Sequence, residues 1–257
     1  MNILEAKSLY SDEWEETSLN FKNKGFYNWC IEQIKNSNSI IEIGAGCGFS
    51  TDFIISNNKR VFSIEENEIN FEKIKNKLKN TDNISFIINP EDENNLNENN
   101  IVLTNFLTDE RLHSNLISKI SFDTIILWFL GVHSMAHFDI DLNNIGYKEK
   151  NTGDYRDLIY KKIFTETSKS LPKNGIINLI ERGAYIETKE EEENIKEQYK
   201  KYYQFDKYDL KIQSLTQIEV EDLMKISGIN MKLTNSDGNI INKKVKHALM
   251  SIIIVKK

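Results

Sequence analysis

The sequence is poor in cysteine. Only Cys30 and Cys47 occur among 257 residues, and they form no CxxC pair. Small extracellular domains that rely on disulfides, and zinc sites built on cysteine, need more cysteines at closer spacing. The pattern therefore argues against a disulfide framework and a cysteine-based metal site. We predict that Cys47 is simply a small side chain that fits its surroundings.

Long apolar runs are also missing. No segment approaches the roughly 20 apolar residues that cross a bilayer, and we predict no membrane partner. The N-terminus, MNILEAKSLYSDEWEE, is acidic and has neither the basic start nor the apolar centre of a signal peptide. We therefore predict a cytoplasmic protein.

The chain lacks an excess of positive charge. Its formal net charge is −6, with 39% hydrophobic and 28% charged residues, as in a rather polar globular protein. Broad electrostatic binding of nucleic acid needs a basic face, so this charge makes a nucleic-acid partner less expected, although a local basic patch stays open. The length suits one α/β domain with a substantial core.

What the sequence does contain is a glycine-rich turn between a strand and a helix. Residues 40–51 read IIEIGAGCGFST: an apolar run with Glu42, then Gly44, Gly46 and Gly48 at alternate positions, then a segment able to form a helix. Glycines tolerate positive φ and let a ligand approach the main chain closely. A strand, tight turn and helix N-terminus in succession are typical of nucleotide-like ligand sites in α/β proteins.

The rest of the chain alternates apolar runs with helical patterns. This alternation predicts a mostly parallel sheet with helices on both faces and an antiparallel hairpin at the C-terminal edge. Beyond the first strand we expect strands at 60–64, 84–88, 101–104, 122–129, 176–180, 228–234 and 248–255. Helices are expected at 4–36, 50–59, 67–80, 108–120, 154–169, 189–203 and 216–227.

Four features together resemble the class I S-adenosylmethionine-dependent methyltransferases. They are the E-x-G-x-G-x-G of Glu42 to Gly48, the strand VFSIE that ends at Glu65, the FDTIIL strand and the LPKNGIINLI turn and strand. A closing β-hairpin is also a habit of that family. The resemblance implies a Rossmann-like, doubly wound, mostly parallel seven-stranded sheet with an antiparallel C-terminal hairpin, here preceded by an N-terminal helical cap.

The resemblance also implies which residues hold S-adenosylmethionine. The main chain of Gly44, Ala45 and Gly46 would lie beside the methionine and ribose portions, and Glu42 would approach the ammonium group directly or through water. Glu65, 21 positions beyond Gly44, would accept hydrogen bonds from the ribose hydroxyls. Further cofactor contacts are expected from Glu66 along the adenine edge and from Trp128.

The adenine-contacting position after the third strand departs from the family pattern. That family usually has an acid there, but two runs compete for the strand: ISFII at 84–88, followed by Asn89-Pro90-Glu91-Asp92, and IVLT at 101–104, followed by Asn105. Spacing from the preceding helix favours the first run as the third strand, whereas direct junction with the following helix favours the second. If the second run is the third strand, Asn105 lies near the adenine amino group and the first run is an added strand or hairpin.

The segment after the fourth strand usually carries the chemistry in this fold. Here it contains neither [DNS]-P-P-[YFW] nor a cysteine, which argues against base N-methylation of DNA and against cytosine C5 methylation. It does contain His133 and His137, with Asp139 and Asp141 nearby. A histidine can take a proton from an attacking hydroxyl or amine, so both histidines are candidate catalytic residues, beside the alternatives of an ordinary polar loop or, less expected, a metal site.

These observations predict one methyltransferase domain over 1–257, with a helical cap at 1–36, a cofactor-binding core at 37–181 and a lid, helical insertion and closing hairpin at 182–257. The predicted reaction is methyl transfer from S-adenosylmethionine to an O or N atom of a small molecule or protein side chain. The alternatives are an RNA methyltransferase, a non-catalytic S-adenosylmethionine-binding or scaffolding subunit, and an NAD-dependent dehydrogenase, against which the closing hairpin speaks.

Overall fold

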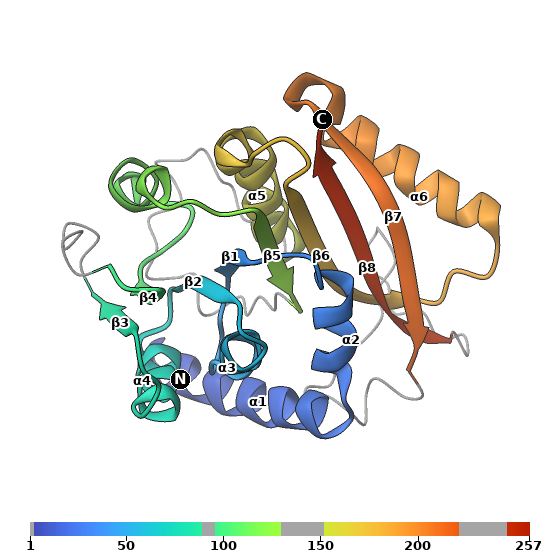
Figure 1. The fold of residues 1–257 in the computed structure, drawn as a ribbon. Helices are drawn as coiled ribbons and strands as arrows, with labels where there is room; N and C mark the ends of the chain where they lie inside the picture. Colours follow the sequence, from blue (N-terminus) through green and yellow to red (C-terminus); the bar gives the residue numbers. More distant parts are fainter. Residues whose placement is uncertain (1–2, 89–95, 130–151, 221–245) are drawn as a thin grey trace.

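An eight-stranded sheet forms the centre of the computed structural model, which describes residues 3–88, 96–129, 152–220 and 246–257 (Figure 1). The spatial order is β3-β4-β2-β1-β5-β6-β8-β7. All neighbouring strands pair in parallel except β8, which is antiparallel to both β6 and β7. The strands are β1 (Ser39–Ile43), β2 (Arg60–Glu65), β3 (Ile84–Ile87), β4 (Asn99–Leu103), β5 (Thr124–Trp128), β6 (Ile176–Ala184), β7 (Leu210–Glu219) and β8 (His247–Lys256).

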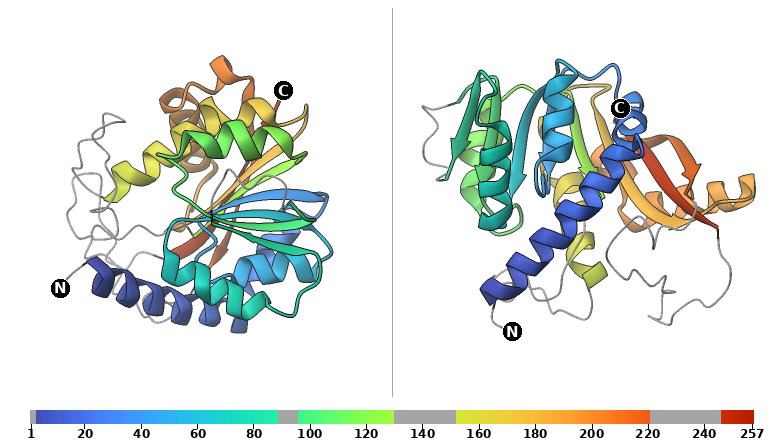
Figure 2. Two further views of the ribbon diagram at one scale, coloured as in Figure 1. Left: turned by 90° about the vertical axis from the view of Figure 1, so that its left-hand side faces the viewer. Right: turned by 90° about the horizontal axis from the view of Figure 1, so that it is seen from below.

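Helices cover both faces of this sheet (Figure 2). One face packs against the aromatic N-terminal helices and α3, through a buried cluster that includes Trp14, Phe21 and Ile54. The other face packs against α5 and the 112–119 segment, through Leu112, Leu116 and Ile163. The helices are α1 (Ile3–Asn23), α2 (Phe26–Gln33), α3 (Phe49–Ser56), α4 (Glu68–Leu78), α5 (Thr152–Thr165) and α6 (Lys189–Tyr202), with short helical turns at Leu112–Leu116, Ile117–Lys119, Thr167–Ser170 and Phe205–Tyr208. None of the helices in these ranges is long and apolar enough to cross a membrane.

The predicted alternation of strands and helices is confirmed, with local differences. The helix expected over 4–36 is interrupted at Gly25, whose φ of 75° lies in the left-handed region and ends α1 before α2 begins. The helix expected over 108–120 contains a π turn at Leu112–Leu116. Such breaks follow from local backbone geometry, which hydrophobic periodicity does not specify.

The question of the third strand is resolved by strand order. β4 lies beside β2 and pairs with it from Phe62↔Asn100 to Glu65↔Leu103, whereas β3 pairs with β4 at the sheet edge. The run at 101–104 is therefore the strand that continues the parallel core. The run at 84–88 is an added edge strand, so the sheet has eight strands where the family resemblance implied seven.

The closing hairpin has a different first strand from the one predicted. β8 covers the expected 248–255, but its hairpin partner is β7 at Leu210–Glu219, so the helix expected from residue 216 is wrong over 216–219. The register of β7 shifts between Ile212 and Ser214. This irregularity interrupts the period-two pattern by which a half-buried strand is recognised in a sequence. The expected strand at 228–234 lies outside the described residues.

Candidate active site

A cavity opens where the strand order reverses between β1 and β5. It is lined by residues that follow the carboxyl ends of four strands: Gly44, Ala45 and Gly46 after β1, Glu65 and Glu66 at β2, Thr104, Asn105 and Phe106 after β4, and Trp128 and Phe129 at β5. Helix α1 adds Lys7, Tyr10, Trp14 and Ser18, and α5 adds Tyr155 and Ile159. Ligands of open α/β sheets bind at this switch point, because the loops there diverge to opposite faces.

The glycine turn is held against β2 by main-chain hydrogen bonds. The N–H groups of Gly44 and Ala45 both donate to the carbonyl of Ile64, at 2.9 and 3.2 Å. Gly44, Gly46 and Gly48 have φ values of 79°, 55° and 76°, which only glycine adopts readily. The turn thereby presents its backbone to the cavity at Gly44, Ala45 and Gly46, as the sequence motif indicated.

Glu65 fastens this turn to the start of α4. Its Oε2 accepts from the Gly46 N–H at 2.7 Å, while Oε1 accepts from the Asn67 N–H at 2.9 Å and from Asn70 Nδ2 at 3.2 Å. Burial, with a smaller contribution from neighbouring Glu66, raises the pKa of Glu65 to about 7 although these hydrogen bonds oppose the shift. The carboxyl group therefore titrates near neutral pH at the edge of the cavity.

A second polar cluster joins β2, β4 and α5. Glu66 Oε2 accepts from Tyr155 Oη at 2.7 Å and from Asn105 Nδ2, and Asn105 Nδ2 also lies 3.1 Å from Tyr155 Oη. Asn105 Oδ1 accepts from the N–H groups of Leu107 and Thr108, both at 2.9 Å. Asn105 is thus fixed at the cavity by contacts on both ends of its amide.

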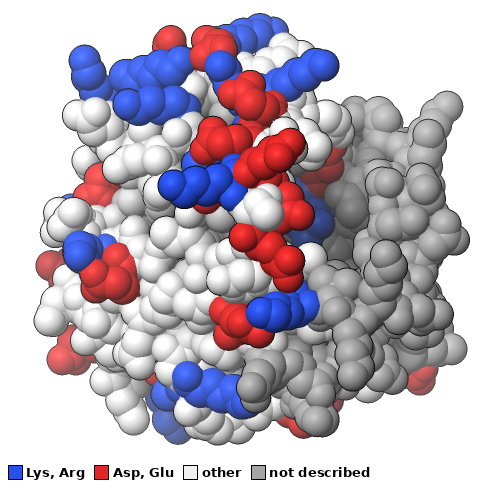
Figure 3. All heavy atoms as spheres, turned by 90° about the vertical axis from the view of Figure 1, so that its right-hand side faces the viewer, with Lys and Arg blue, Asp and Glu red and all other residues white. Residues whose placement is uncertain are grey.

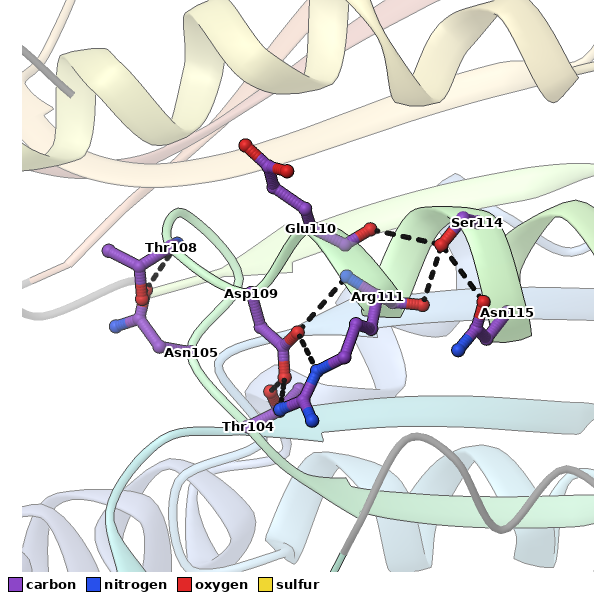
Figure 4. A network of polar contacts seen from close by, with 8 residues as sticks. All are labelled: Thr104, Asn105, Thr108, Asp109, Glu110, Arg111, Ser114 and Asn115. Carbon is purple, nitrogen blue, oxygen red and sulfur yellow. Dashed lines mark hydrogen bonds and ion pairs between the residues drawn. The ribbon is translucent and has the colours of Figure 1, made fainter. Parts of the chain in front are cut away.

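The loop after β4 is stiffened by a neighbouring network (Figure 4). Asp109 accepts from Thr104 Oγ1 at 2.8 Å and from Arg111 Nε at 3.0 Å. Partial burial acts to raise the pKa of Asp109, but the hydrogen bonds from Arg111 and Thr104 outweigh this effect and keep the pKa below its ordinary value. A charged Asp109 is therefore part of the scaffold that positions Asn105.

Glu42 is placed differently from the other predicted cofactor residues. It is 2% exposed and does not line the cavity. Its Oε2 accepts from Thr51 Oγ1 and Ser63 Oγ, each at 2.6 Å, and burial raises the pKa of the carboxyl group. In this structure Glu42 connects β1, β2 and α3 behind the glycine turn, and its predicted contact with an ammonium group stays a prediction.

Aromatic side chains form the remaining part of the cavity. Trp128 is fixed by a hydrogen bond from its Nε1 to Asn178 Oδ1 at 2.7 Å, and Asn178 in turn donates to Ser251 Oγ at 2.7 Å. Tyr10 and Trp14 of α1 meet edge to face, with ring centroids 6.1 Å apart. Aromatic rings attract cations, so the rings of Tyr10 and Trp128 suit a positively charged group, whereas the ring of Trp14 already faces the Arg182 guanidinium.

Sequence reasoning missed several of these residues. Asn70 and Tyr155 line the cavity but were not among the predicted site residues, and Tyr10 and Trp14 were predicted only as parts of the N-terminal helical cap over 1–36. Cys47 fits as a small side chain, with its Sγ 3.3 Å from Asn70 Oδ1 and 3.4 Å from the Ser11 carbonyl. The candidate catalytic residues His133 and His137, like Asp139 and Asp141, lie outside the described residues.

Comparisons with known proteins give structural matches only. No protein-family model and no curated protein sequence matches the chain. Among solved structures, a TehB-like SAM-dependent methyltransferase from Corynebacterium glutamicum aligns with a TM-score of 0.46 and 12% identity, over 97% of this chain and 100% of that one. A putative RNA methyltransferase from Pyrococcus horikoshii aligns at 0.44 and 10% identity, over 90% and 81%.

Two further matches differ in coverage. A putative caffeoyl-CoA O-methyltransferase from Staphylococcus aureus aligns at a TM-score of 0.42 and 14% identity, over 90% of this chain and 82% of that one. TrmN from Thermus thermophilus aligns at 0.44 and 8% identity, and this chain spans only 44% of its length. The fold is described by the strand order itself: a mostly parallel sheet with its glycine turn after β1 and an antiparallel closing hairpin, as the resemblance to class I S-adenosylmethionine-dependent methyltransferases implied.

Proposed function

We propose that this protein transfers a methyl group from S-adenosylmethionine to an O or N atom of a small molecule or a protein side chain. The observation that carries the proposal is the convergence of the glycine turn, the Glu65 carboxylate and aromatic side chains on one cavity at the switch point of the sheet. A carboxylate there suits ribose hydroxyls, exposed main chain suits close approach, and aromatic rings suit a sulfonium cation.

The chemistry needs alignment more than acid–base catalysis. In the transfer, a lone pair of the acceptor would bond to the methyl carbon while the carbon–sulfur bond breaks and leaves its electron pair on sulfur, and an O–H or N–H acceptor would lose its proton to solvent or to a base. Because S-adenosylmethionine supplies the leaving group, the protein contributes mainly by holding acceptor and methyl in line. Trp128, held by Asn178, and Asn105, held at both ends of its amide, are fixed side chains that would keep the cofactor in place for this alignment.

Calorimetric titration tests cofactor binding. We expect the purified protein to bind S-adenosylmethionine and its demethylated product, and Glu65→Gln to weaken binding by about tenfold or more, because hydrogen bonds to a charged acceptor each contribute about 1.5–3 kcal/mol. Glu72→Gln is the matched control, since its side chain is 60% exposed on α4. Binding of NADH with no binding of either sulfur compound would contradict the proposal.

Transfer itself needs a separate assay, because a non-catalytic binding subunit would pass the calorimetric test. The protein is incubated with S-adenosylmethionine carrying a labelled methyl group and with small-molecule, protein and RNA fractions of a cell extract. We expect label in the small-molecule or protein fraction. Tight cofactor binding without label in any fraction would favour the scaffolding alternative, and label confined to RNA would favour the RNA methyltransferase.

A further inference from the structure

Arg182 lies beside the cavity, just beyond the end of β5. In the register of β5 and β6, Trp128 pairs with Ile180, so Arg182 is two residues past the last pair. Side chains alternate along a strand, which puts Arg182 on the same face as Ile180, the face that packs against the N-terminal helices. Its guanidinium carbon lies 5.1 Å from the ring centroid of Trp14, which lines the cavity.

Two buried donors at this place lack an acceptor. Arg182 Nη1 and Trp14 Nε1 are both buried and have no hydrogen-bond partner within the ranges that the structure describes. A buried donor without a partner is costly, and one on a charged guanidinium more so. Two such donors on adjoining side chains are a site for an anionic oxygen, because both can donate and neither can accept.

The nearest acid in the sequence does not serve this purpose. Glu181 points to the opposite face of β6, where its two carboxylate oxygens accept from Tyr160 Oη and, at 3.0 Å, from Tyr199 Oη. The other arginines are differently placed. Arg111 binds Asp109, and Arg60 is exposed at the opposite end of the sheet.

The charge at this site persists at neutral pH. Burial, together with the positive charge of Arg156, lowers the pKa of Arg182 to about 10 although Tyr10 opposes the shift. By contrast, Glu181 and Tyr160 raise the pKa of Arg156 against the effect of its burial. Arg182 is therefore the guanidinium near the cavity whose charge is least compensated among the described residues.

We infer that Arg182 and Trp14 form an anion subsite for the methyl acceptor, and that the acceptor is a small molecule carrying a carboxylate or phosphate group. The inference rests on the proposed function and specifies its substrate class. A guanidinium binds either anion through paired, charge-assisted hydrogen bonds, and the indole N–H adds a third donor. Because both donors are buried, the subsite fits a compact anion better than the backbone of a polymer.

Titration with small probes tests the subsite. The full-length protein, with and without saturating S-adenosylhomocysteine, is titrated with benzoate, benzamide and inorganic phosphate in a calorimeter. We expect benzoate or phosphate to bind at least about tenfold more tightly than benzamide, the factor that one charge-assisted hydrogen bond supplies. Arg182→Gln should abolish this preference and Trp14→Phe, which keeps the ring but removes Nε1, should reduce it severalfold. Arg60→Gln is the matched control and should change nothing.

The outcomes distinguish a failure of the anion subsite from a failure of the proposed function. Preference for benzoate over benzamide identifies a carboxylate site, and preference for phosphate identifies a phosphate site. The subsite would be overturned if all three probes bind with equal affinity or if none of them binds. It would also be overturned if the preference for anions survives in both Arg182→Gln and Arg182→Met. Unchanged S-adenosylhomocysteine binding by Arg182→Gln shows that the variant is folded. Failure of the wild-type protein to bind S-adenosylhomocysteine would instead contradict the proposed function, whatever the anions do.

Discussion

Glu65 is a carboxylic acid whose ionisation is set by conflicting surroundings. Its side chain is 5% exposed, which disfavours the charge, yet it accepts three hydrogen bonds, which favour it. Burial prevails, and its pKa is raised from 4.5 to about 7. The residue that we expect to accept hydrogen bonds from the ribose is thus partly protonated at neutral pH.

This balance makes cofactor affinity depend on pH. The charged carboxylate accepts from two hydroxyls, whereas the protonated form must first release its proton. Affinity for S-adenosylhomocysteine should therefore fall by up to tenfold per pH unit as the pH drops below about 7, and level off above it. Calorimetry between pH 5.5 and 8.5, within a range where the fold is intact, measures the profile. Glu65→Gln should remove the step near pH 7, and an equal step in that variant would assign the titration to another group.

For single residues, the sequence predicts which side chains face the cavity better than it predicts their hydrogen-bond partners. Gly44, Glu65 and Asn105 were expected there from the resemblance to the methyltransferase family, and each of them lies at or just after the end of a strand and lines the cavity. Tyr155 donates to Glu66 across 89 positions of the chain. No spacing rule covers such a contact, since it depends on how α5 packs on the finished sheet.

The glycine turn shows how one element serves two purposes. A Cβ at Gly48 would lie 2.9 Å from Ile74 Cγ1 of α4, so this glycine allows α3 and α4 to pack closely. A Cβ at Gly46 would meet no atom within 4 Å, although Gly46 lines the cavity. Both positions have positive φ, so alanine is strained at each, but only Gly48 adds a steric clash.

The two alanine variants should therefore separate stability from binding. Gly48→Ala should lower the free energy of unfolding by about 2–4 kcal/mol, the sum of left-handed strain and overpacking. Gly46→Ala should cost only about 1–2 kcal/mol for the strain, yet weaken S-adenosylhomocysteine binding more than Gly48→Ala does. Urea denaturation and calorimetry of the two variants measure both quantities. The reverse order of stability losses would show that Ile74 moves aside without cost.

Elements with strong periodicity were predicted well, and the exceptions have identifiable causes. The buried run at 122–129 and the amphipathic helix at 67–80 follow from residue pattern alone, and they form β5 and α4. β7 was missed because its irregularity at Ile212 and Ser214 breaks the alternation. The competing runs at 84–88 and 101–104 are both strands, and only long-range pairing shows which of them is internal to the sheet.

The charge distribution of the whole molecule bears on its acceptor. The net charge is −6, and the face over α6 and β7 carries acidic side chains in a band with lysines interspersed (Figure 3). Helix α6 begins with the acids Glu190, Glu191 and Glu192, which stabilise its N-terminus. On the described part of this face, positively charged side chains lie along the upper edge beside acidic ones and are scattered below it (Figure 3).

Weak binding of RNA is expected from the net charge of −6. Counterion release from a basic surface supplies most of non-specific affinity for nucleic acids, with dissociation constants of about 10⁻⁴–10⁻⁶ M at physiological salt for proteins that have such a surface. For this protein we expect no saturation of a fluorescent single-stranded RNA up to about 100 µM protein at about 0.15 M salt. Fluorescence polarisation at several salt concentrations measures it. Micromolar binding that weakens steeply with salt would instead reveal several phosphate contacts and make RNA the expected acceptor. An anionic small molecule does not need such a surface, because the one guanidinium of Arg182 is sufficient to bind its charged group.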